Sequence, residues 1–346
     1  MRPSRAEEKQ VRLPSLSLGL GLRCSSVTAA TPTRDRVGGD KRAEACAAVS
    51  ARFGEPLTGT VGSTRAWLLV EHPGPWPADA LAQALGPDLL AEIERRAPTV
   101  RTVLIRRSAR REVVRPLCVL ISSAGAEPWM RQVRLDDYRE ILGLDLESLD
   151  AGAQPSSGEV RTAPLFTVCT HGRRDVCCAA FGRPVLRALA AEHDEVWECT
   201  HIGGDRFAAN LLCFPHGLYY GHLDPTSALE SARLYNEGRV RPSNLRGRSG
   251  VPASGQAAEH FVRIHTGAHG IDDVVAGTSQ QVDASTVRVL VAADGQTYDV
   301  VLEGRPVDAA ITGGCGLRES VDRTSWSLHS LRPLDRRPSD RAQEVR

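Results

Sequence analysis

The segment PLFTVCTHGRRDVCCAAFGRPVLRALAAEHDEVWECT, residues 164–200, decides the fold prediction. It begins with an apolar run, Pro164–Cys169, that is typical of a buried strand. A polar loop rich in cysteine follows, and Arg183–Glu192 then has the spacing of a helix. Glu195–Thr200 is a second apolar run. The segment therefore predicts a strand–helix–strand unit with its polar residues directly after the first strand.

Further elements extend this unit on its C-terminal side. Asn210–Pro215 and Leu218–Gly221 form a predicted hairpin, and a helix is predicted from Asp224 or Thr226 to Tyr235. Strand, helix, strand, antiparallel hairpin and helix is the thioredoxin-like order. A coarse version of it precedes this unit, with predicted helices at 42–52, 78–97 and 138–142 and predicted strands at 66–71, 99–105 and 117–122. The predicted fold class is α/β, with tandem thioredoxin-like α/β sandwich domains and a small C-terminal α+β segment.

The predicted domain boundaries follow changes in composition. A stretch rich in Gly, Ser and Pro at 151–158 is a predicted linker. The C-terminal segment begins with a basic loop, Arg246–Ser249, followed by a predicted helix ending at Ile264 and strands at 286–292, 297–302 and 325–331. The predicted parts are 1–40 as a disordered extension, 41–152 as the N-terminal domain, 159–238 as the second domain, 239–332 as the C-terminal segment and 333–346 as a disordered tail.

Charge and hydropathy exclude several classes of protein. The 346 residues include 43 Lys and Arg and 42 Asp and Glu, for a formal charge of +1. This balance argues against a nucleic-acid protein that binds through bulk charge. No apolar run approaches the roughly 18 residues of a membrane span, and 13–22 is too interrupted for an export signal. We therefore expect a cytoplasmic protein without nucleic-acid or membrane partners.

Cysteine use points to metal or redox chemistry. The chain has nine cysteines, an odd number that does not indicate a disulfide framework. Five of them fall within 45 residues: Cys169, Cys177, Cys178, Cys199 and Cys213. In a reducing compartment, such a cluster is more typical of a metal or redox site than of structural disulfides.

Two polar blocks carry these cysteines, and each follows a predicted strand. In the first, CTHGRRDVCC at 169–178, a helix start and two arginines favour thiolates. The second, CTHIGGDRF at 199–207, contains a Gly-Gly pair that allows a tight turn. The short Cys-x2-4-Cys spacing of zinc sites is missing, so the spacing slightly favours an iron–sulfur site over zinc.

The same blocks resemble the sucrase/ferredoxin-like family. The resemblance rests on CTHGRRDVCC at 169–178, HIGGDRFAAN at 201–210, PHGLYYG at 215–221 and RGRS at 246–249. It extends to GEPLTGT at 54–60 and WLLVE at 67–71, so that it covers roughly residues 40–265. The family's C-terminal half is related to thioredoxin-like [2Fe–2S] ferredoxins, and the resemblance therefore implies such a cluster here.

The resemblance also implies a set of ligands. Family members hold the cluster with Cys-x8-Cys and His-x3-His, which places Cys169, Cys178 and His201 at three ligand positions. Asp205 occupies the position of the second histidine. The fourth ligand is therefore Asp205, or Cys199 or Cys177, or the site is empty. Histidine ligands raise the reduction potential and a carboxylate lowers it, so we expect an intermediate, moderately pH-dependent value.

Three functions follow from these observations. The first is an iron–sulfur electron-transfer protein that works with unidentified redox partner proteins rather than as an enzyme. The second is a thiol–disulfide redox protein that uses Cys169, Cys177 and Cys178. The third is a zinc-binding or metal-free interaction protein.

Overall fold

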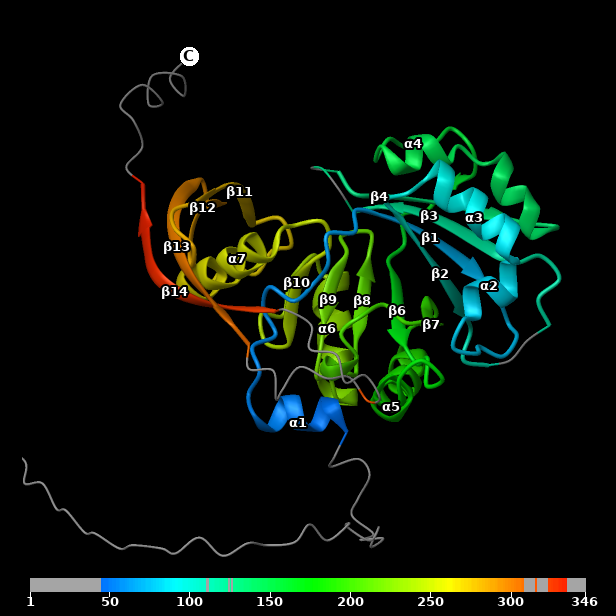
Figure 1. The fold of residues 1–346 in the computed structure, drawn as a ribbon, viewed down its shortest axis with the longest axis horizontal. Helices are drawn as coiled ribbons and strands as arrows, with labels where there is room; N and C mark the ends of the chain where they lie inside the picture. Colours follow the sequence, from blue (N-terminus) through cyan, green and yellow to red (C-terminus); the bar gives the residue numbers. More distant parts are fainter. Residues whose placement is uncertain are drawn as a thin grey trace, which may run out of the picture. The chain divides into compact units, whose positions relative to one another are not determined.

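The fold of the chain is built around two β-sheets (Figure 1). The computed structural model describes residues 45–109, 112–123, 125, 127–307, 315 and 323–334. Among these residues, ten strands form one sheet and four form another. The predicted extension at 1–40 and the predicted tail from 335 onwards lie outside the described residues, and Pro333 ends a strand.

The large sheet places strands from both halves of the chain side by side. From one edge to the other, its strands are β10 (Leu245–Arg248), β9 (Leu218–Tyr220), β8 (Leu211–Phe214), β6 (Leu165–Cys169), β7 (Val196–Cys199), β2 (Val100–Arg106), β1 (Ala66–Glu71), β3 (Leu117–Ser122), β4 (Trp129–Arg134) and β5 (Glu159–Val160).

Each half of this sheet has the same pairing pattern. β1 lies parallel to β2 and antiparallel to β3, and β6 lies parallel to β7 and antiparallel to β8. β4 and β9 then pair antiparallel with β3 and β8. The halves join where β2 and β7 pair antiparallel, with Ile105 opposite Cys199. A mixed α/β fold is thus confirmed, whereas the thioredoxin-like identity of each half stays a prediction.

Helices pack on one face of each half of the large sheet. The helices of the described residues are α1 (Cys46–Arg52), α2 (Ala80–Leu85), α3 (Pro87–Arg96), the 3-10 helix η1 (Tyr138–Gly143), α4 (Leu146–Asp150), α5 (Val176–Glu192), the 3-10 helix η2 (Asp205–Phe207), α6 (Pro225–Asn236) and α7 (Ala253–Thr266). Buried side chains of α2, α3 and α4 share a core with β1–β3, and those of α5 and α6 share one with β6 and β8. The figure shows these two helical groups separately (Figure 1).

The opposite faces of the two halves share a single core. In β1, Trp67 and Leu69 lie in this shared core while Leu68 faces the helices, because strand side chains alternate between faces. Trp67 packs edge-on against Phe214 of β8 at 5.4 Å between ring centroids. The sheet is therefore curled. Cys169 and Cys199 lie on its inner face, and Cys178 of α5 belongs to the same core.

The four-stranded sheet forms a separate core with one helix. Its order is β11 (Val274–Gln281), β12 (Thr286–Ala293), β13 (Gln296–Pro306) and β14 (Thr324–Pro333), all antiparallel. Inward valines of β12 and β13 pack against α7, as expected from their alternation with polar residues. The predicted strands at 286–292, 297–302 and 325–331 are present, and β11 was not predicted.

Several predicted elements differ in extent from the observed ones. Helix α5 begins at Val176 rather than Arg183, because Asp175 caps it. The predicted helix at 78–97 is two helices, since Gly86 between them has a φ of +80°. The predicted loop Arg246–Ser249 is wrong: most of it forms the edge strand β10, which pairs with β9.

The predicted domain limits fall within the large sheet. β5, at the start of the predicted second domain, pairs with β4 of the first half, and β10 pairs with β9 across the limit at residue 238. Gly39–Arg346 is one compact unit. Among the helices that the structure describes, none combines the length and the apolar character that crossing a bilayer requires.

Candidate metal centre

The first turn of α5 presents two buried cysteines to two different groups of side chains. The Asp175 carboxylate caps the helix by accepting the backbone N–H of Cys177 at 2.7 Å. Cys177 and Cys178 are consecutive, and successive helical side chains point about 100° apart. The two thiols therefore face different neighbours, and both lie near the positive end of the helix dipole.

One group consists of Cys169, Cys178 and His201. A potential ligand atom of each lies within 4.8 Å of those of the other two. Cys178 Sγ is 3.8 Å from His201 Nδ1. Both cysteines are buried, whereas the His201 side chain is 23% exposed. The structure thus brings together three of the residues that the sequence analysis singled out.

The topology explains why these residues meet. β6 and β7 are parallel, with Cys169 directly beside Cys199, so their carboxyl ends lie at the same edge. His201 follows β7 at this edge, and α5 returns across it. Gly182 allows the helix to come close, since a Cβ at this position would lie 2.2 Å from the Cys169 carbonyl oxygen. A side chain would force α5 away from β6.

Hydrogen bonds within the group favour a thiolate on Cys169. The thiols of Cys178 and Cys199 donate to its sulfur and hold the pKa of Cys169 well below its ordinary value. His201 contributes in the same direction. The hydrogen bond to Cys169, and then burial, raise the pKa of Cys178, and burial raises that of Cys199. Cys199 contacts Cys169 from the neighbouring strand, but its sulfur is not one of the three donor atoms that lie within 4.8 Å of one another.

His171 holds His201 in place. The backbone N–H of His201 donates to His171 Nδ1 at 3.3 Å, and His171 Nε2 donates to the carbonyl of Pro77 at 2.7 Å. Both ring nitrogens are thus engaged in the neutral tautomer, and burial lowers the pKa of His171. This contact holds the backbone of His201, rather than its imidazole ring, beside His171.

Asp205 lies beside this group rather than within it. Its Oδ1 is 3.9 Å from His201 Nε2, and its side chain is 17% exposed. Asp205 also interacts with the Asp175 carboxylate that caps α5. Burial, and then repulsion from Asp205, raise the pKa of Asp175. Asp205 thus contacts the Nε2 side of the His201 ring, whereas Cys178 lies near Nδ1.

A buried arginine shapes the loop between His201 and Asp205. Arg246 donates to the carbonyl of Gly203, to Asn210 Oδ1 and to the carbonyl of Thr60, and desolvation lowers its pKa to about 10. Gly204 has a φ of +74°, and a Cβ there would lie 2.4 Å from this guanidinium. Arg246 is therefore structural, and the glycine is required at this turn.

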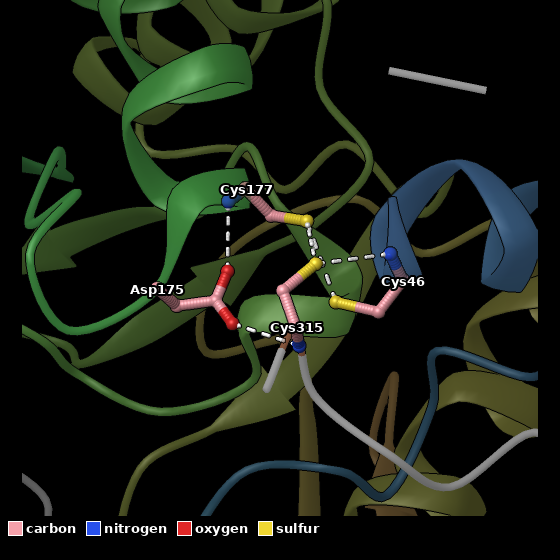
Figure 2. Close-up of side chains that lie close together, drawn as sticks. All are labelled: Cys46, Asp175, Cys177 and Cys315. Atoms are coloured by element: carbon pink, nitrogen blue, oxygen red, sulfur yellow. Dashed lines mark hydrogen bonds between the residues drawn. The ribbon is translucent and has the colours of Figure 1, made fainter. Parts of the chain in front are cut away.

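The structure places Cys177 in a second group with Cys46, Cys315 and Asp175 (Figure 2). The Sγ atoms of Cys177 and Cys46 are 3.4 Å apart, and those of Cys177 and Cys315 are 3.2 Å apart. The thiol of Cys46 donates to Cys177 and lowers its pKa to about 7. Sequence analysis missed this group, because Cys46 and Cys315 lie in no recognisable motif.

The arginines of the two cysteine blocks differ in exposure. Arg206 is 1% exposed and pairs with buried Glu55 at 2.5 Å. Arg173 and Arg174, by contrast, are exposed beside the group. Arg173 lines a cavity of about 740 Å³ that Arg106, Arg183 and Arg187 also line, together with Trp76 and His171.

A smaller cavity reaches His201 itself. It measures about 350 Å³, and its lining includes His201, His171, Arg174 and residues of α2 and α3 such as Leu81 and Leu90. The N-terminal half thus borders the exposed side of the histidine. Two buried sulfurs and one accessible imidazole form a donor set suited to a thiophilic metal centre.

Comparisons with known proteins agree with the motifs. The profile of the sucrase/ferredoxin-like family matches residues 57–247. The chain is 26% identical over 105 residues to a protein of Candida glabrata named "Altered inheritance of mitochondria protein 32", a match that covers 26% of this chain and 34% of that protein. A protein of the same name from Meyerozyma guilliermondii is 31% identical over 75 residues, or 18% of this chain and 27% of its own length. The matches thus span about a third of these relatives, and no solved structure matches.

Proposed function

The chain belongs to the sucrase/ferredoxin-like family, and we propose that it is an electron-transfer protein whose Cys169, Cys178, His201 and Asp205 bind a [2Fe–2S] cluster. The observation that carries the proposal is the convergence of three donors from separate elements. Cys169 ends β6, Cys178 lies in α5 and His201 follows β7, yet their ligand atoms lie within 4.8 Å of one another. These are the positions at which the family resemblance implies ligands.

The residues present are chemically suited to this cluster. Thiolate sulfur is the usual ligand of iron–sulfur clusters, and imidazole replaces it on one iron in Rieske centres. Cys169 already favours the thiolate form that ligation requires. A carboxylate is a harder ligand that also binds iron, and Asp205 lies on the His201 side of the group.

When bound, the cluster supplies one-electron exchange. The chain's own residues bury the two cysteine sulfurs in the core shared by both halves and thereby exclude water from them. His201 lies at the border of the smaller cavity, so it is the ligand nearest to an approaching partner. His171 holds the backbone of His201, and Arg246 holds the loop that leads to Asp205.

The proposed partner is a protein with an acidic contact surface. Arg173, Arg183 and Arg187, which we term the α5 arginine patch, line the larger cavity and are exposed. Within the described part of the chain, none of the three has a carboxylate partner at salt-bridge distance. A patch of one sign attracts an oppositely charged partner and increases its association rate. The cytoplasmic location predicted from the sequence is part of this proposal.

Metal analysis of the anaerobically purified full chain tests the cluster. We expect brown protein with two irons and two sulfides per chain and an EPR signal after reduction. Cys169→Ser and Cys178→Ser should each abolish cluster binding, because each removes a thiolate from the buried group. His201→Cys should retain iron and shift the g-values toward those of an all-sulfur cluster.

Cys118→Ala is the matched control. Cys118 is fully buried in another core, and it should tolerate the change without loss of iron. Protein that remains free of iron after anaerobic reconstitution, while the control folds normally, would contradict the proposal. If such iron-free protein has a reactive thiol, the thiol–disulfide alternative is favoured.

A further inference from the structure

A second cysteine group lies on the other side of the first turn of α5. It contains Cys46 from the start of α1, Cys177 from α5 and Cys315, with Asp175 beside them (Figure 2). We propose that this group binds one zinc ion through Cys46, Cys177, Cys315 and Asp175. The proposed zinc site shares no ligand with the proposed cluster.

The donor set matches a closed zinc site. One ligand atom from each of the four residues lies within 4.8 Å of those of the other three. Zinc–thiolate bonds of about 2.3 Å place tetrahedral sulfur ligands about 3.8 Å apart. The observed Sγ separations of 3.4 and 3.2 Å need only about half an ångström of expansion to reach this geometry.

The contacts around the sulfurs are those that thiolate ligands require. The backbone N–H of Cys46 donates to Cys315 Sγ at 3.3 Å, and the backbone of Ala47 hydrogen-bonds to the Cys177 sulfur. A thiolate accepts such bonds more strongly than a thiol does, because it carries the charge. Arg323 also interacts electrostatically with Cys46 and offsets negative charge at the site.

Asp175 is oriented toward the group by two backbone contacts. Its Oδ1 accepts the N–H of Cys177 at 2.7 Å, and its Oδ2 accepts the N–H of Cys315 at 3.0 Å (Figure 2). Each carboxylate oxygen retains a second lone pair that can bind a metal. Asp175 thus joins the α5 segment to Cys315 even before a metal binds.

The three cysteines come from distant parts of the chain. Cys177 is 131 residues from Cys46 and 138 residues from Cys315. Bringing such distant segments together costs conformational entropy, and a shared ion offsets that cost. No pair is at the disulfide distance of about 2.05 Å, and all three cysteines are free.

Metal content and zinc X-ray absorption of the full chain test the proposal. We expect one zinc per chain, in addition to any iron, with about three sulfur neighbours at about 2.3 Å. Cys46→Ser together with Cys315→Ser should lower zinc at least fivefold and leave the iron content unchanged. Asp175→Asn should weaken zinc retention against a chelator, since asparagine still caps the helix but binds zinc poorly.

Control variants separate this proposal from the cluster. Cys169→Ser with Cys178→Ser should remove iron but retain zinc, and Cys118→Ala should retain both. The zinc proposal fails if zinc stays below about one fifth of an equivalent after reconstitution of folded protein, or if the double variant at Cys46 and Cys315 keeps its zinc. It also fails if mass spectrometry finds Cys177 in a disulfide with either cysteine. None of these outcomes depends on whether iron is bound.

Discussion

Asp205 is the residue at which the chain departs from the ligand pattern of its family resemblance. The resemblance implies histidine at this position, which would make the second iron's ligands two neutral imidazoles. The structure places the Asp205 carboxylate 3.9 Å from the ring of His201 and near the capping carboxylate of Asp175. A negatively charged ligand stabilises the oxidised cluster, so Asp205 should lower the reduction potential.

Asp205→His should therefore raise the midpoint potential. We expect an increase on the order of 100 mV, because the range between plant-type and Rieske centres spans a few hundred millivolts for two such replacements. Redox titration followed by EPR measures it. Asp205→Glu keeps the charge and is the control. An unchanged potential in Asp205→His would contradict ligation by Asp205. Cys199 or Cys177 would then be the candidate for the fourth ligand.

The residues of the two groups differ in how far the sequence could predict them. Cys169, Cys178 and His201 stand in motifs directly after predicted strands, and parallel strands end at a common edge. No local pattern connects Cys46 with Cys315, which are 269 residues apart. Only the folded chain shows that adjacent cysteines of α5 face opposite groups.

Helix α5 connects both groups, and its position depends on a close approach to β6. The sequence analysis placed its start at Arg183, because the cysteine block obscures the apolar spacing of its first turns. Asp175 is the observed cap, and the helix includes both Cys177 and Cys178. The sequence indicated a helix start in this block, and the capping contact shows that the helix includes both cysteines.

Gly182→Ala should separate α5 from β6. The new Cβ would lie 2.2 Å from the Cys169 carbonyl oxygen, a backbone atom that cannot rotate away. We expect a loss of at least about 2 kcal/mol in the free energy of unfolding and a lower iron content per chain. Urea denaturation and iron analysis measure the two effects. Gly143→Ala is the control, since nothing lies within 4 Å of its Cβ position; equal stability of both variants would contradict the close approach.

The four-stranded sheet depends on a buried carboxylate. Asp299 of β13 is fully buried, and it accepts hydrogen bonds from Arg288 of β12 at 2.6 Å and from Arg332 of β14 at 3.0 Å. These bonds, chiefly from Arg288, lower the pKa of Asp299. Because the folded-state pKa is depressed, the carboxylate stabilises the fold above its unfolded pKa of about 4. That contribution is lost as the pH falls through the lower folded value.

Asp299→Asn should consequently destabilise the protein at pH 7 and have little effect in acid. We expect a loss of about 1 kcal/mol at neutral pH, a modest value because both arginines are partly exposed to solvent. The difference from the unsubstituted protein should shrink below about pH 4. Chemical denaturation at several pH values measures it, and a difference that is constant with pH would contradict the argument. Asp194→Asn, on the exposed turn before β7, is the control.

Element prediction succeeded where apolar alternation was strong and failed where tertiary pairing decides. β1, β3 and β6 are completely buried, and the sequence predicted all three. β4 has mixed burial, with polar residues between its apolar ones, and it went unpredicted. The arginines of β10 suggested a loop, but pairing with β9 and burial of Arg246 make it an edge strand.

In the whole molecule, the two halves of the large sheet share one hydrophobic core and have the same pattern of strand pairing. The sequence predicted their repetition at the level of elements. It could not predict their joining, because the antiparallel contact of β2 with β7 connects residues 94 positions apart and has no local signal. As a result, the N-terminal half covers the inner face of the second half and borders the cavity at His201.

The α5 arginine patch gives the other side of this site a positive charge, even though the whole chain has a formal charge of only +1. Reversing part of it, with Arg183→Glu and Arg187→Glu, should change the rate of electron exchange without changing the midpoint potential. Oxidation of the reduced protein by anionic ferricyanide should slow about tenfold at low salt, and oxidation by cationic hexaammineruthenium(III) should accelerate. Stopped-flow absorbance measures both rates.

Screening provides the decisive comparison for this prediction. The Debye length falls from about 30 Å at 0.01 M salt to about 3 Å at 1 M. For each oxidant, the ratio of the variant's rate to that of the unsubstituted protein should therefore approach 1 as the salt concentration rises. Arg65→Glu with Arg139→Glu is the matched control, because both arginines are exposed, lie outside the α5 arginine patch and give the same change in net charge. If this control alters the rates as much as the variant at Arg183 and Arg187 does, only net charge matters. If the opposite changes for the two oxidants and the salt dependence belong to the variant at Arg183 and Arg187 alone, electrons enter and leave beside α5.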